Sequence, residues 1–186
     1  MSDQTKSAST WTDDAGVLFV GDQAWNTSIY GADCALAEGE LSHSVYAQGF
    51  GFTIPEDATI EGVSVSLSRS AGYPNAIQDA QVRLIRQWGP YSNDQASSDL
   101  WPVSIPAAKS YGGSSDLWGW DWSGISPSDV NDSEFGVAVQ AGCTGPDTSV
   151  IIGSSPVYIT ACEITIHYTP GEGGSASQAA ALLMML

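Results

Sequence analysis

The stretch from Val157 to Tyr168, VYITACEITIHY, decides the fold class of this chain. It is rich in β-branched and aromatic residues, and its side chains alternate between two faces. Both properties are typical of a long β-strand. A second stretch, Thr59 to Ser68 (TIEGVSVSLS), places Val63, Val65 and Leu67 between serines. This period of two predicts another strand, with one apolar face and one face of hydroxyls.

Further strands are expected on either side of these two stretches, at 16–20, 44–52, 80–86 and 134–140. Residues 25–40 are interrupted by Asn and Gly and are expected to be mostly loop, and 54–58 a turn. One short helical turn is predicted near Pro127, with Ser126 as its N-cap and Asp129 three residues later. Several short strands without long helices predict an all-β fold, an antiparallel β-sandwich or jelly roll.

The length of 186 residues fits one folded domain with extended N- and C-terminal arms. Residues 1–15 are polar and are expected to form an arm outside the core, followed by the sandwich at 16–170. Residues 171–186 begin as a Gly/Ser-rich linker and end in an apolar segment. We expect this C-terminal arm to lie against another subunit as a clamp, through Leu182, Leu183, Met184, Met185 and Leu186.

The charge of the chain excludes two classes of partner. It has 21 acidic residues against 5 Lys and Arg, a net charge of -16. Nucleic-acid binding needs clustered basic residues, and anionic membranes repel an acidic surface. The first residues lack the pattern of a secretory signal, and no apolar run is long enough to span a membrane. We therefore expect synthesis in a host cytoplasm, and no nucleic-acid or membrane partner.

Motifs of catalysis are not found in the sequence: there is no nucleophile elbow, phosphate loop, zinc-protease motif or dinucleotide fingerprint. The histidines are His43 and His167, and His167 is expected to be structural or at the surface. The run from Asp129 to Glu134 resembles a calcium loop only superficially and is interpreted as a capped turn. The three well-separated cysteines are expected to be buried thiols. We predict no catalytic residues, no cofactor and no metal.

The tryptophans of one segment are the most informative aromatic residues. In an extended chain, Trp118, Trp120 and Trp122 would lie on one face. If buried, they would anchor the core or a subunit interface, and if exposed, they would form a platform on which sugars stack. Burial is the interpretation we favour, because each ring hides a large apolar area.

Four segments resemble one family of tailed-bacteriophage and prophage virion structural proteins. They are GFGFTIPEDATIEGV at 49–63, IQDAQVRL at 77–84, YGGSSDLWG at 111–119 and SEFGVAV at 133–139. The resemblance covers roughly residues 44–168, with order and spacing kept. It consists of strand and turn signatures, so it implies a structural virion component and carries over no catalytic residue.

Two function classes follow. The first is a capsid decoration, or cement, protein that stabilises the exterior of a phage head, where a net charge of -16 would not face packaged DNA. Its partners would be the major capsid protein or other virion subunits, and it would form a homo-oligomer. The second is a host-recognition module of a tail fibre or tail tip that binds glycans through the tryptophan face. A tail-tube or connector subunit is a weaker third possibility, and an enzyme the weakest.

Overall fold

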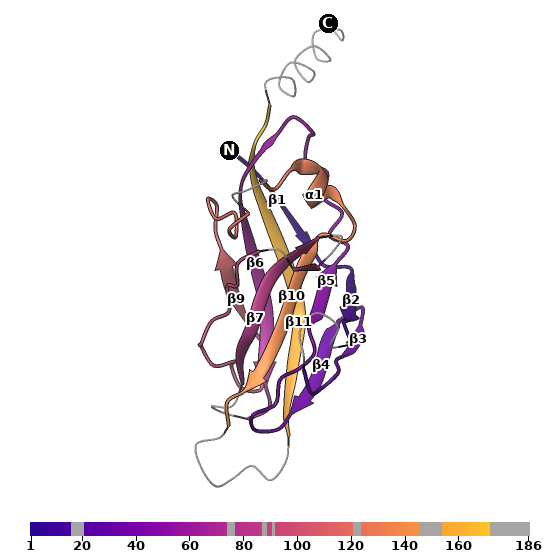
Figure 1. The fold of residues 1–186 in the computed structure, drawn as a ribbon, viewed down its shortest axis with the longest axis vertical. Helices are drawn as coiled ribbons and strands as arrows, with labels where there is room; N and C mark the ends of the chain where they lie inside the picture. Colours follow the sequence, from indigo (N-terminus) through magenta and orange to yellow (C-terminus); the bar gives the residue numbers. More distant parts are fainter. Residues whose placement is uncertain are drawn as a thin grey trace, which may run out of the picture.

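The computed structural model describes residues 1–15, 21–73, 77–86, 89–90, 92–120, 124–145 and 154–171. These residues form two antiparallel β-sheets that run along the long axis of the molecule (Figure 1). Side chains from both sheets make one continuous hydrophobic core. The predicted all-β sandwich is confirmed.

The first sheet has six strands in the order β3-β4-β11-β6-β9, and β1 also pairs with β11. β11 is long enough to take two partners on one side, β4 near its start and β1 near its end. The strands of this sheet are β1 (Ser2–Ser7), β3 (Asn26–Ser28), β4 (Gly31–Leu36), β6 (Thr59–Ala71), β9 (Ala107–Gly112) and β11 (Ser155–Thr169).

The second sheet has five strands in the order β2-β5-β10-β7-β8, with β10 at its centre. Every residue of β10 is buried, so both of its faces are covered. The strands are β2 (Thr10–Asp13), β5 (Val45–Gln48), β7 (Ile77–Arg86), β8 (Gly89–Pro90) and β10 (Gly136–Cys143).

The strand predicted from 157–168 is confirmed as part of β11, but its alternation is broken. A register shift between Ile159 and Ala161 interrupts the pairing with β6. Before it, Val157 and Ile159 are buried, and after it, Cys162 and Ile164 are buried. A β-bulge inserts one extra residue, which moves the following side chains to the opposite face. Odd-numbered residues of β11 therefore face the core before the bulge, and even-numbered residues face it after the bulge. In this way β11 keeps its apolar side chains in the core along its length.

The prediction that residues 1–15 form an arm outside the core was wrong, because the structure places most of them in the two sheets. β1 pairs with β11 from Ser2 to Ser7, and β2 pairs with β5. Trp11 belongs to the core. Alternating polar residues gave β1 no apolar face in the sequence, and its strand is fixed by backbone pairing to β11 at the side that β4 leaves open.

Two other expectations about the N-terminal half need correction. Residues 25–40 contain β3 and β4, a hairpin turning at Ile29 and Tyr30, instead of being mostly loop. The strand expected over 44–52 is shorter, because β5 ends at Gln48 before Gly49, which has a positive φ of 70°. The strand expected at 16–20 lies outside the described residues.

The predicted helical turn is confirmed as α1 (Pro127–Asn131). Ser126 is its N-cap, and Asp129 completes a capping box in which each residue binds the other's backbone. Asp129 thus caps a helix, as expected, and Arg86 of β7 also binds it. Within the part of the chain that the structure describes, no helix has the length and apolar character needed to cross a membrane.

Candidate functional site

The structure confirms burial for two of the three predicted tryptophans. Trp118 is 0% exposed and Trp120 is 5% exposed, while Trp122 lies outside the described residues. Trp118 has a positive φ of 55°, so it does not lie in an extended strand, and the reason for expecting a shared face was wrong. Neither Trp118 nor Trp120 offers a ring face to solvent for sugar stacking.

Trp118 is held against β6 by its indole. Its Nε1 donates a hydrogen bond to the carbonyl of Val63 at 2.8 Å. Gly112 makes this contact possible, because a Cβ there would lie 2.3 Å from both the indole nitrogen and the Val63 oxygen. Gly112 also has a φ of 66°, which other residues rarely adopt. Trp118 is therefore an anchor of the core.

Trp120 packs beside the one described helix. The guanidinium of Arg86 lies 5.4 Å from the centre of the Trp120 ring, a cation–π distance, and pairs with Asp129 at 3.1 Å. These contacts connect β7, the segment after β9 and α1. The tryptophan segment thus has a structural role in this part of the molecule.

A buried polar network joins the two sheets near the end of β6. Arg69 of β6 pairs with Asp79 of β7, with side chains only 3% and 0% exposed. Asp79 also accepts hydrogen bonds from Trp101 Nε1 at 2.8 Å and from the Tyr111 hydroxyl at 2.9 Å. The Arg69 guanidinium lies within cation–π distance of both rings, 5.2 Å from the centre of Trp101 and 5.9 Å from that of Tyr111. Burial, and then the charge of Asp79, raise the pKa of Tyr111, so its hydroxyl stays protonated and donates.

This network resembles a reactive site in composition but is closed to solvent. Its groups bind one another, apart from Arg69 Nε, for which the described residues supply no acceptor, and they secure the segment 92–106 to both sheets; the backbone amide of Ser97 also donates to Asp79. A substrate would have to displace buried, paired charges at high cost. We therefore assign the network to stability.

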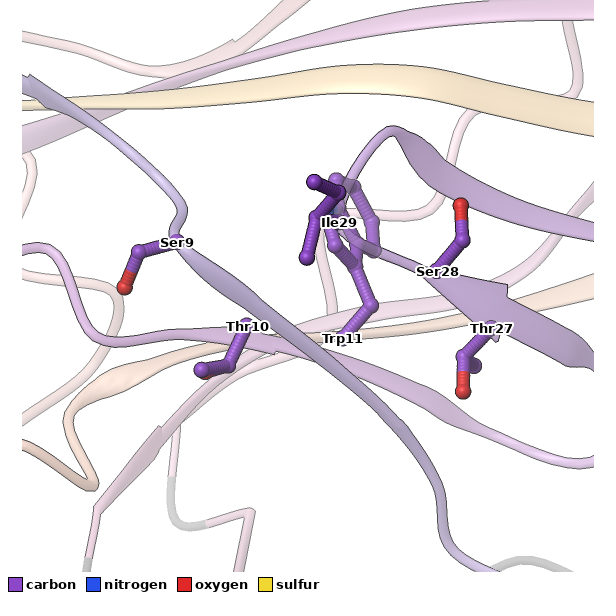
Figure 2. Close-up of a pocket in the computed structure, with 6 residues that line it drawn as sticks. All are labelled: Ser9, Thr10, Trp11, Thr27, Ser28 and Ile29. Carbon is purple, nitrogen blue, oxygen red and sulfur yellow. The ribbon is translucent and has the colours of Figure 1, made fainter.

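A small open pocket of about 240 Å³ lies where the edge strands β2 and β3 approach each other (Figure 2). Trp11 and Ile29 supply its apolar surface, and hydroxyls supply the rest. The residues that line it are Ser9, Thr10, Trp11, Thr27, Ser28 and Ile29.

The turn beside this pocket carries two of the most exposed large apolar side chains among the described residues. Ile29 is 74% exposed and Tyr30 is 80% exposed. At the opposite edge of the same sheet, just before β9, Ile105 is 76% exposed. Exposed apolar side chains on projecting turns are suited to contacts with another protein.

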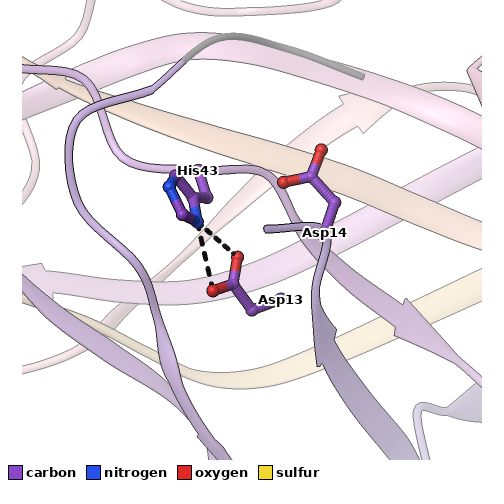
Figure 3. Close-up of side chains that lie close together, drawn as sticks. All are labelled: Asp13, Asp14 and His43. Carbon is purple, nitrogen blue, oxygen red and sulfur yellow. Dashed lines mark hydrogen bonds and ion pairs between the residues drawn. The ribbon is translucent and has the colours of Figure 1, made fainter. Parts of the chain in front are cut away.

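Three groups that could hold a metal ion meet at the end of β2: Asp13, Asp14 and His43 (Figure 3). The ring nitrogen Nδ1 of His43 lies 3.0 and 3.2 Å from the two carboxylate oxygens of Asp13. One ligand atom from each of the three residues lies within 4.8 Å of the others. The sequence analysis did not single out this cluster, since 28 or more positions separate His43 from the aspartates and only the pairing of β2 with β5 brings them together.

The second histidine has a structural environment. His167 Nδ1 contacts Asp3 at 2.8 Å, and its Nε2 contacts the Ser64 hydroxyl at 2.9 Å. It therefore connects β1, β11 and β6 across the outer surface of the first sheet. A structural or surface role was expected for His167, and these contacts fit it.

The three cysteines are free and buried, as the sequence predicted. Burial, with smaller contributions from Asp33 and Asp13, raises the pKa of Cys34 to about 12. Burial also raises the pKa of Cys162. Thiols held in the protonated form are poor nucleophiles and poor metal ligands. The predicted clamp residues, Leu182 to Leu186, lie outside the described residues.

Comparison with known proteins does not place the chain in a family. No protein-family model matches it, and no curated protein is significantly similar to it. A chain of the infectious bursal disease virus Gt strain is 12% identical, with a TM-score of 0.35 over 89% of this chain and 33% of that one. This chain thus spans about a third of the viral chain's length.

Two carbohydrate-binding domains show the same weak similarity. The CBM22-1 xylan-binding domain of Paenibacillus barcinonensis Xyn10C is 9% identical, with a TM-score of 0.35 over 88% of this chain and 93% of that domain. The N-terminal cellulose-binding domain of Cellulomonas fimi β-1,4-glucanase C is 12% identical, with a TM-score of 0.33 over 89% and 88%. Values this low identify neither a family nor a function.

Proposed function

We propose that this chain is a structural virion protein of a tailed phage, a decoration protein that binds the outside of an assembled head and has no catalytic activity. The observation that carries the proposal is the placement of the apolar side chains. Trp118, Trp120 and the cysteines are in the core, whereas Ile29 and Tyr30 project from the β3–β4 turn. A rigid sandwich with exposed apolar side chains at one sheet edge is suited to docking on a protein surface.

The charge of the chain supports the outer side of a head. A net charge of -16 would be repelled by packaged DNA. The same charge favours a shell whose exposed surface is basic at the binding position. The resemblance of segments 49–63 and 133–139 to virion proteins, described above, points to the same class.

Adding the protein back to stripped particles tests this proposal. Heads freed of the chain by urea or salt should bind it saturably and regain resistance to heat. The variant Ile29→Ser/Tyr30→Ser should bind at least about tenfold more weakly, because an apolar contact of two such side chains contributes more than 1.4 kcal/mol.

Ile105→Ser is the matched control. Ile105 has the same exposure as Ile29 but lies at the opposite edge of the sheet, so its replacement should leave binding unchanged. If the native chain does not bind stripped heads, or if the turn variant binds as tightly as the native chain, the proposal is wrong.

We also propose that the apolar segment from Leu182 to Leu186 contacts another subunit, either a sister copy or the shell. The last described strand, β11, ends at Thr169, so a chain ending at Pro170 retains every strand of both sheets that the structure describes. This truncated chain should fold and melt like the full chain but should bind heads or self-associate far more weakly. Equal binding by the two chains would refute the contact while leaving the turn proposal standing.

Glycan recognition is the second candidate, and the pocket between β2 and β3 is the feature that favours it. Hydroxyls such as those of Thr27 and Ser28 beside an indole are groups that sugars bind. Sugar-dependent quenching of tryptophan fluorescence, lost in Thr27→Val/Ser28→Ala, would favour this function. Quenching that Trp120→Ala removes instead would restore the tryptophan segment as the sugar site.

A further inference from the structure

We infer that Asp13, Asp14 and His43 form a binding site for one divalent transition-metal ion such as Zn²⁺. The inference is independent of the proposed function, and it departs from the prediction of no metal that was drawn from the sequence. Asp13 ends β2, Asp14 follows it, and His43 precedes β5, so two segments far apart in the sequence supply the ligands (Figure 3).

The distances suit coordination by a small ion. Two donors that each lie about 2.0–2.1 Å from a tetrahedral Zn²⁺ are about 3.4 Å apart. His43 Nδ1 lies 3.0 and 3.2 Å from the oxygens of Asp13, close to that separation. A ligand atom of Asp14 lies within 4.8 Å of both, so a shift of about 1.4 Å or less would complete three protein ligands. A water molecule would fill the fourth position.

The ligands are held in place by neighbouring groups. The Ser44 amide donates to Asp14 Oδ1 at 3.1 Å, and the Tyr46 hydroxyl lies 3.4 Å from Asp14 Oδ2. The backbone of His43 is fixed on both sides, since its amide donates to Gln23 and its carbonyl accepts from Trp25 Nε1. Such supporting hydrogen bonds orient ligands in metal sites.

A second observation points to a ligand at this place. The Ser44 side chain is buried, with Ser44 only 1% exposed, and the described residues offer its hydroxyl no hydrogen-bond partner. The Asp14 amide donates to the Ser44 carbonyl, and the Ser44 amide donates to Asp14 Oδ1, so this pair continues the register in which Thr12 faces Tyr46. Residues opposite each other in an antiparallel pair share a face, so the Ser44 side chain starts on the same face as Asp14, whereas Asp13, opposite Val45, starts on the other face. A water bound to the ion on the Asp14 side would supply a partner for this hydroxyl, which the described residues do not.

The donor types select the class of ion. An imidazole nitrogen with carboxylates is a set that Zn²⁺ and similar transition metals bind. Ca²⁺ and Mg²⁺ prefer oxygen ligands throughout, so the histidine disfavours both. The bound ion would fasten β2 to the segment before β5 and thereby stabilise the edge of the second sheet.

Calorimetric titration of the full chain tests the site. The protein is first treated with chelator and then titrated with Zn²⁺ in excess Mg²⁺, which occupies unspecific carboxylates on a surface of charge -16. We expect one Zn²⁺ per chain and a rise in melting temperature. Replacing Zn²⁺ by Co²⁺ should give the visible absorption of a four-coordinate ion with a nitrogen ligand.

Two matched pairs of variants separate the site from the surface charge. His43→Gln and Asp13→Asn should each weaken Zn²⁺ binding by at least about 100-fold, the upper end of what losing even an outer-shell partner costs. His167→Gln and Asp3→Asn remove the other aspartate–histidine pair and should leave binding unchanged. The melting temperature of the metal-free protein shows whether each variant folds. If only one of the two site variants folds, its Zn²⁺ affinity is enough to test the site.

Three results would overturn the site. They are no Zn²⁺ binding above the Mg²⁺ background, several ions of equal affinity per chain, or binding that survives both site variants.

Discussion

Replacing Asp79 by Asn tests the buried network that joins the sheets. Asp79 is the common acceptor for the Arg69 guanidinium, the Trp101 indole and the Tyr111 hydroxyl. The substitution keeps the size of the side chain but removes its charge and turns one acceptor atom into a donor. Arg69 would then be a buried cation without a counter-charge, and the described residues supply no acceptor for its Nε.

The expected loss of stability follows from these contacts. Removing one partner of a buried ion pair costs about 3–5 kcal/mol. The asparagine amide would also place a donor where the carboxylate accepted hydrogen bonds, and an unsatisfied buried donor costs a further ~1–3 kcal/mol. The asparagine oxygen can still accept one or two of the bonds, so we expect Asp79→Asn to lower the free energy of unfolding by about 3 kcal/mol. Domains are typically stable by only about 5–15 kcal/mol, so this loss is large but survivable.

Urea denaturation followed by tryptophan fluorescence measures the loss. The double variant Arg69→Met/Asp79→Asn removes both charges and should be less destabilised than the sum of the single variants, with a coupling energy of about 1–3 kcal/mol. Lys109→Met breaks an exposed pair with Asp99 and should leave the midpoint unchanged.

The reasoning about this network is refuted if the losses of stability in Arg69→Met and Asp79→Asn add up to the loss in the double variant. It is equally refuted if Asp79→Asn costs less than about 0.5 kcal/mol, the range of an ordinary surface substitution.

Three further predictions concern other parts of the sandwich. The thiols of Cys34 and Cys162 should react with a thiol reagent only after unfolding, because burial raises their pKa values; rapid labelling of the native chain would contradict this. Ser126→Ala should lower the free energy of unfolding by about 1 kcal/mol, measured by urea, because it removes the helix cap; an unchanged midpoint would argue against the capping box. Burial opposes ionisation of Asp129, but hydrogen bonds from Ser126 and the charge of Arg86 outweigh it and lower its pKa below the ordinary 3.8. Its stabilisation is therefore complete above that value and is lost as the pH falls through the lower, folded-state pKa, so Asp129→Asn should flatten the acid limb of the stability profile; an unchanged limb would contradict the shift.

The sequence alone was sufficient where a residue's environment depends on its immediate neighbours. Val63, Val65 and Leu67 alternate with serines, and this local pattern predicted β6 correctly. Ser126 and Asp129 predicted α1, because a capping box is complete within four residues.

Prediction failed where the chain pairs with a distant partner. β1 is polar on both faces and is a strand because β11 offers free backbone groups to it. The bulge after Ile159 depends on how β11 pairs with β6, so the unbroken alternation expected over 157–168 does not hold beyond it. Trp118 is buried as expected, but through a turn at Gly112 and a bond to Val63 that local spacing does not encode.

The candidate sites divide in the same way. By itself, the sequence determined the fold class, the acidic charge and the burial of the thiols, because composition and period follow from covalent order. Only the tertiary structure decided which residues meet: Asp13 and Asp14 with His43, Arg69 with Asp79, and the apolar turn at Ile29 beside Trp11. Each of these contacts joins segments that are far apart in the sequence. The register between their strands is set by burial of the whole core.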